Sequence, residues 1–180
     1  MLKQAILILL ISVSIMGNCQ NRNNIWCFGD SSLIDFNTQP PSTGASIIRT
    51  RGTACSIADS TGNLLFYCGS PHISLWQSGG VYFLGTIYNK NNEIMENGDT
   101  LAGEGWYNEM VIVPNPYSNL SYYLFHLEMT AQNQGLYYSI IDLSFNNGSG
   151  KVISKNNRLL AGYMGDGISA VKQGNGRDWW

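Results

Sequence analysis

The stretch Asp59-Ser60-Thr61-Gly62-Asn63-Leu64-Leu65-Phe66-Tyr67 joins a cluster of turn-forming residues to an aromatic doublet. Its first five residues favour a hairpin loop, because Gly and Asn adopt the positive φ that such loops commonly require. The flanking runs 53–58 and 64–68 are apolar and have the length of short strands. We therefore predict an antiparallel hairpin that places Ile57 and Leu65 on one buried face.

Two further aromatic doublets, Tyr122-Tyr123 and Trp179-Trp180, follow turn-forming clusters in the same order. From the first doublet to the second is 56 residues and from the second to the third is 57, while a cruder copy at 23–28 ends 39 residues before the first. A period of roughly 40 to 57 residues is typical of folds in which each repeat is one small sheet. The spacing predicts a β-propeller with WD40-like or kelch-like blades, in which blade packing, rather than sugar stacking, explains the doublets.

Apolar alternation and frequent Gly and Pro predict strands along the whole chain after the N-terminal segment. Strands are expected at residues 25–29, 53–58, 64–68, 73–76, 82–88, 110–113, 122–129, 136–142, 150–154, 167–171 and 178–180. No sustained 3.6-residue apolar period follows residue 19, so the predicted fold class is all-β.

Residues 1–19 have the features of a signal peptide. Lys3 supplies a positive charge near the start, and an apolar run follows at 5–16. Small residues after this run suit cleavage before Gln20. The run is shorter than the roughly 20 residues of a transmembrane helix. We expect a secreted or cell-surface protein. A lipoprotein acylated at Cys19 is the less favoured alternative, because the preceding residues fit a lipobox poorly.

The charge distribution argues against a nucleic-acid partner. The net charge is −2, only 12% of the residues are charged, and no basic stripe occurs.

Three cysteines remain after the predicted cleavage, Cys27, Cys55 and Cys68, and a secreted context permits disulfides. Counting outward from the hairpin turn, Cys55 faces Tyr67 and Cys68 lies diagonally across, one residue out of register. A Cys55–Cys68 bridge is thus one reading, since a disulfide requires Cα atoms about 4.4 to 6.8 Å apart. Burial of all three as small hydrophobic residues is the preferred reading.

Candidate catalytic and metal-binding residues have structural interpretations that we favour. Asp59 begins a turn that resembles an Asp box with one extra residue before the glycine, and we expect an Asx-type cap. His126 and Glu128 share a strand face and could form a general base and its orienter, yet an exposed cross-strand pair is favoured. A solvated loop is favoured over a Ca²⁺ site for five carboxylates, Glu93, Glu96, Asp99, Glu104 and Glu109. No catalytic, cofactor-binding or metal-binding residue is therefore assigned.

Several segments resemble one family, the propeller-like N-terminal regions of large secreted proteins of Bacteroidota. The main strings are Asn24-Ile25-Trp26-Cys27-Phe28-Gly29 and Ser56-Ile57-Ala58-Asp59-Ser60-Thr61-Gly62-Asn63-Leu64-Leu65-Phe66-Tyr67. Further matches, in the family's order, are residues 94–98, 111–116, 122–125, 135–142, 170–172 and 175–180. An apparent insertion at 77–87 departs from the family pattern.

The resemblance implies a surface or secreted propeller and supplies no catalytic residues. Members of the family often carry a downstream gliding-motility-type or type IX secretion sorting domain, which would associate the protein with the outer membrane or cell surface. A closed propeller has about 4 to 8 blades. We therefore expect residues 20–180 to be an incomplete arc of about three blades, the N-terminal portion of a longer protein, which alone is marginally stable or self-associating.

Two functions fit these observations. The favoured one is a non-catalytic module that binds an unidentified protein or glycan, without a cofactor. The alternative is a lactonase-like or glycosidase-like propeller enzyme whose catalytic blades lie beyond residue 180.

Overall fold

The computed structural model describes residues 21–71, 85–103, 107–129, 134–165, 167–173 and 179, with the side chains of Arg51 and Pro71 excepted. The strands are β1 Ile25–Phe28, β2 Asp30–Asp35, β3 Ser42–Ala58, β4 Leu64–Pro71, β5 Thr86–Asn89, β6 Met110–Pro114, β7 Ser121–Glu128, β8 Gly135–Asp142 and β9 Lys151–Ala161. Two short 3-10 helices, η1 Asn21–Asn23 and η3 Asn146–Gly148, accompany them. Over these ranges the fold is all-β, as predicted, and contains no closed barrel or propeller.

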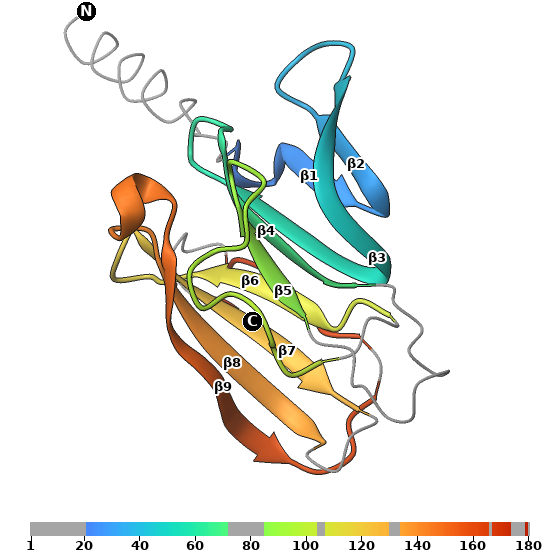
Figure 1. Ribbon diagram of the computed structural model, residues 1–180, viewed down its shortest axis with the longest axis vertical. Helices are drawn as coiled ribbons and strands as arrows, with labels where there is room; N and C mark the ends of the chain where they lie inside the picture. The colour runs from blue at the N-terminus through green and yellow to red at the C-terminus, as the bar shows by residue number, and fades with distance from the viewer. Residues whose placement is uncertain are drawn as a thin grey trace, which may run out of the picture.

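The strands form two antiparallel layers (Figure 1), with the orders β1-β2-β3-β4-β5 and β6-β7-β8-β9. Each order follows the chain, so both sheets are meanders. β3 is 17 residues long and pairs with β2 through its first part and with β4 through its second. Irregularities in both pairings, including one at Ser31 with φ 62°, accompany the curvature of β3 seen in Figure 1.

The main core lies between the two sheets and draws on both. Its buried members are Ile57, Phe66, Cys68, Ile87, Met95, Leu101, Met110, Ile112, Tyr122, Leu124, Ile141, Leu143 and Val152. A second core, on the other face of the β3-β4 hairpin, contains Ile25, Cys27, Ile48, Ala58 and Tyr67. The hairpin is therefore buried on both faces, which explains its almost continuous apolar sequence.

In the two aromatic doublets that the structure describes in full, the two rings lie on opposite faces of a sheet. Phe66 enters the main core and Tyr67 the second core. Tyr122 is buried against Phe66, with ring centroids 5.3 Å apart and an edge-to-face angle of 79°, whereas Tyr123 lies on the opposite face near Tyr138. The first residues of these two doublets thus meet across the main core. Trp180 lies outside the described residues.

The predicted hairpin over residues 53–68 is confirmed: Ile57 is buried in the main core, and the half-buried Leu65 packs against it. The sequence did not reveal β2, the first half of β3 or the end of β9. The expected strand at 73–76 lies outside the described residues. The expected strand at 167–171 is wrong: these residues form no strand, Ile168 hydrogen-bonds Asn108, and Lys172 forms an isolated bridge with Trp179.

Candidate functional site

His126 and Glu128 are buried, so the prediction of an exposed pair is wrong. Their side chains are 0% and 5% exposed, and they share the face of β7 that carries Tyr122 and Leu124. The first sheet and the 100–103 segment cover this face. Alternation along β7 reveals which residues share a face, but it does not reveal that another layer covers them.

A chain of hydrogen bonds fixes the imidazole of His126. Its Nδ1 donates to the Ala102 carbonyl over 2.5 Å, and its Nε2 lies 3.1 Å from the Ser139 hydroxyl, which in turn accepts from the Asn156 backbone N–H. The ring also stacks on Tyr137. Burial lowers the pKa of His126 to about 4, against the opposing effect of the hydrogen bond to Ala102. The arrangement supports a neutral, structural histidine that crosslinks β7, β8, β9 and the 100–103 segment.

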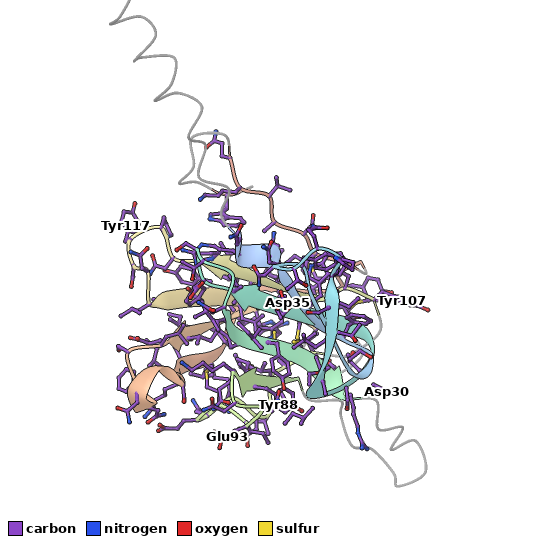
Figure 2. All side chains as sticks on the ribbon, turned by 90° about the horizontal axis from the view of Figure 1, so that it is seen from above. Asp30, Asp35, Tyr88, Glu93, Tyr107 and Tyr117 are labelled. Atoms are coloured by element: carbon purple, nitrogen blue, oxygen red, sulfur yellow. The ribbon has the colours of Figure 1, made fainter. Side chains whose placement is uncertain are left out.

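The carboxylates of the acidic stretch are not brought together. Glu96 pairs with Lys151 at 2.7 Å and Asp99 with Lys155 at 3.3 Å, both against β9. Glu93 accepts a hydrogen bond from Asn89 and lies at the periphery of the molecule (Figure 2). Glu109 is fully buried, so the prediction of a solvated loop is wrong for that residue.

No group of three or more His, Cys, Asp or Glu side chains that could hold a metal ion occurs among the described residues, and Glu104 lies outside them. The acidic stretch thus offers no assembled Ca²⁺ site within the part of the chain that is described.

Asp59 caps the hairpin turn, as predicted. Its Oδ1 accepts hydrogen bonds from the backbone N–H groups of Thr61 and Asn63 over 2.8 and 3.0 Å, and from the Thr61 hydroxyl over 2.7 Å. Desolvation raises the pKa of Asp59, but the hydrogen bonds from Thr61 and Asn63 outweigh it and hold the pKa well below its usual range. The role of Asp59 is therefore to form the turn.

Cys55 and Cys68 lie directly opposite one another, which corrects the predicted diagonal register. Ala58 faces Leu64 as expected, but the pairing shifts by one residue between Ile57 and Ala58. As a result Cys55 pairs with Cys68, and their Sγ atoms are 3.1 Å apart. A bulge of this kind could not be deduced from the spacing of the cysteines.

A groove of about 510 Å³ opens beside Cys55. Its walls come from three separated segments: residues 55–57 of β3, Val111, Ile112 and Pro114 of β6, and residues 170–172. Arg22, Asn23 and Trp179 complete the lining. A smaller cavity of about 260 Å³ shares Asn23, Cys55 and Ser56 with the groove and extends to the exposed ring of Trp26.

The groove lining is apolar with two cations. Among its described residues, Arg22 and Lys172 carry positive charge, and none is acidic or a histidine. The Arg22 guanidinium donates to the Tyr122 hydroxyl over 3.3 Å, which orients it near the groove. Such a lining suits a ligand that combines an apolar or ring face with an anionic group.

Other exposed aromatic residues do not form part of this site. Tyr107 and Tyr117 are 65% and 89% exposed and project from opposite sides of the molecule (Figure 2).

Comparison of the chain with protein-family models, with curated proteins and with solved structures gave no match. Within the described residues, no helix has the length and apolar character needed to cross a membrane.

Proposed function

We propose that the chain is a non-catalytic, secreted or cell-surface β-propeller module whose groove binds a protein segment or glycan with an acidic group. The observation that supports this most directly is the composition of the groove walls. The wall segments at 55–57, 111–114 and 170–172 each precede one of the three aromatic doublets, and in a propeller such corresponding inner segments surround the channel.

Corresponding positions in the three units support the propeller arrangement. The first residue of each aromatic doublet pairs with a residue just before its turn: Phe66 with Ile57, Tyr122 with Pro114, and Trp179 with Lys172. The aromatic residues recur at intervals of 56 and 57 in the sequence, and their partners at intervals of 57 and 58. The first two units thus share a strand, a turn and an aromatic strand, and the bridge between Lys172 and Trp179 is the corresponding pairing of the third.

Two hydrogen bonds between the sheets support an arrangement as adjacent blades. The Glu109 backbone N–H, next to the start of β6, donates to the Thr53 hydroxyl in the part of β3 that pairs with β4. The Val152 N–H of β9 donates to the Glu96 carbonyl beyond β5. β3 thus contacts the start of β6, and the segment beyond β5 contacts β9, which supports an arrangement of β3-β4-β5 and β6-β7-β8-β9 as adjacent blades.

The groove chemistry favours binding over catalysis. General acid–base catalysis requires a positioned group such as His, Asp or Glu near the reacting bond. The described lining provides cations, apolar surface and the indole of Trp179 instead. Trp and Arg are the residues most enriched where binding energy is concentrated.

Binding to arrays of acidic and neutral glycans and peptides, followed by titration of the retained ligands, tests this function. We expect Trp179→Ala and Lys172→Glu to weaken the binding of an acidic ligand at least about tenfold, since each removes a central contact. Tyr117→Ala, an exposed aromatic remote from the groove, is the matched control and should leave affinity unchanged. Ligands bound equally by all variants, or turned over as lactone or glycoside substrates, would contradict the proposal.

A further inference from the structure

The strongest unassigned feature is the pair of thiols on the β3-β4 hairpin. Cys55 and Cys68 are register partners in neighbouring antiparallel strands, and their sulfur atoms are 3.1 Å apart. Directly opposed residues in such strands have Cα atoms about 4.5 or 5.5 Å apart, depending on the hydrogen-bonding position. Both values lie within the range of about 4.4 to 6.8 Å found in disulfides. A disulfide would bring the sulfurs only about 1 Å closer.

The two thiols differ in access. Cys55 is half-buried and lines both the groove and the smaller cavity, so a small molecule in either would lie beside this residue. Cys68 is fully buried in the main core, and this burial raises the pKa of its thiol. The thiolate is the nucleophile, and burial disfavours the thiolate of Cys68. We therefore expect an incoming reagent to react with Cys55 first.

The third cysteine of the sheet is separated from this pair. Cys27 belongs to the second core, on the other face of the hairpin from the main core that Cys55 and Cys68 contact. Burial raises the pKa of the Cys27 thiol to about 12. Cys27 is therefore an internal reference for an unreactive thiol in the same sheet.

We propose that Cys55 and Cys68 are a redox modification site, which a small disulfide donor entering through the groove converts to a cross-strand disulfide. In the first step the Cys55 thiol loses its proton to solvent, and its sulfur attacks one sulfur of the donor. The donor's S–S bond breaks, one donor thiol leaves, and a mixed disulfide forms on Cys55.

In the second step the Cys68 thiol loses its proton and its sulfur attacks the Cys55 sulfur. The Cys55–Cys68 bond forms, the mixed disulfide breaks, and the second donor thiol leaves. The two cysteines are oxidised by two electrons, and the donor is reduced to two thiols. This inference does not depend on the proposed binding function.

The full chain, reduced and then incubated folded with oxidised glutathione, provides the test. The chain is then unfolded, alkylated and cleaved with a protease that cuts after Phe66 and Tyr67. This cleavage separates the two cysteines unless a disulfide joins them, and mass spectrometry detects the linked peptides. We expect Cys55 and Cys68 to become protected together while Cys27 remains alkylated. Alkylation of both Cys55 and Cys68, a lasting glutathione adduct on Cys55, or a bond from Cys55 to another cysteine would overturn the proposal.

Two variants extend the test. If either fails to fold, the disulfide mapping of the unmodified chain decides whether Cys55 and Cys68 form the bond. Cys68→Ser should stop the reaction at the glutathione adduct on Cys55, whereas Cys27→Ser should form the Cys55–Cys68 bond as the unmodified chain does. Oxidation should also raise the Tm by about 5 to 10 °C relative to the reduced chain, because the bond restricts the unfolded state. An unchanged Tm with full linkage would contradict only this last expectation of stabilisation.

Discussion

The imidazole of His126 is the residue-scale feature with the clearest consequence for stability. It is fully buried, donates through Nδ1 to the Ala102 carbonyl and lies against the Ser139 hydroxyl. Protonation would place a charge among these groups without solvent. The folded state therefore binds a proton on this ring more weakly than the unfolded state does, which makes folding dependent on pH.

We predict that acid destabilises the fold through His126. Its pKa is about 4 in the fold, against 6.5 for an ordinary histidine. The contribution is fully present above pH 6.5 and is lost as pH falls toward 4, by about 3 kcal/mol in total. Urea unfolding from pH 7.5 to 4 measures it. His126→Gln should remove this part of the pH dependence, whereas His72→Gln, at the other histidine, should keep it. Equal pH profiles for all three proteins would refute the assignment of this pH dependence to His126.

At the scale of elements, the turn between β3 and β4 is held by one carboxylate. Asp59 accepts from Thr61 and Asn63, and Gly62 at the tip has φ 97°. This φ favours glycine, and a Cβ on Gly62, which would lie 2.1 Å from the Asn37 side-chain oxygen, would also displace the Asn37 side chain.

We predict that Asp59→Ala lowers the free energy of unfolding by about 1 to 2 kcal/mol, because several turn hydrogen bonds are lost while water replaces part of them. Denaturant unfolding at neutral pH measures the change. Ser60→Ala, an exposed position in the same loop, serves as the control and should stay within about 0.5 kcal/mol of the unmodified chain. A larger effect at Ser60 than at Asp59 would show that the carboxylate does not hold the turn.

The same hairpin shows how far sequence reasoning reaches. The turn residues and the apolar runs predict the hairpin because both signals are local. The register at Cys55 and Cys68 depends on a bulge near Ile57, which pairing rules alone do not predict. β2 and the first half of β3 were missed since their polar sequences are strands only through pairing with β1 and with each other. The groove escaped prediction for a related reason, because its walls are more than 50 residues apart in sequence.

At the scale of the whole molecule, the shared main core makes the two sheets one folding unit. Phe66 of the first sheet and Tyr122 of the second are buried in contact, and Met95 and Leu101 from the connection between the sheets join the same cluster. Neither sheet can keep this face out of water without the other. Separate unfolding of the two sheets would expose most of the buried apolar surface.

We predict one cooperative unfolding transition for the described domain. Phe66→Ala should lower the free energy of unfolding by about 3 to 5 kcal/mol and should reduce amide-exchange protection in β8 as well as in β4. Calorimetry and hydrogen exchange measure the two effects, with Tyr117→Ala as an exposed control. Loss of protection confined to β4 and its neighbours would mean that the sheets fold independently.

The outer strand of the second sheet, β9, also influences whether the molecule aggregates in concentrated solution. β9 lies at the end of its sheet, and its pairing with β8 contains three irregularities. It carries Lys151, Lys155 and Arg158, and the first two form ion pairs with the segment beyond β5. Bulges and positive charge on a border strand discourage another chain from adding a strand there. Ordered stacking into fibrils through this border is therefore opposed by the strand's own shape and charge.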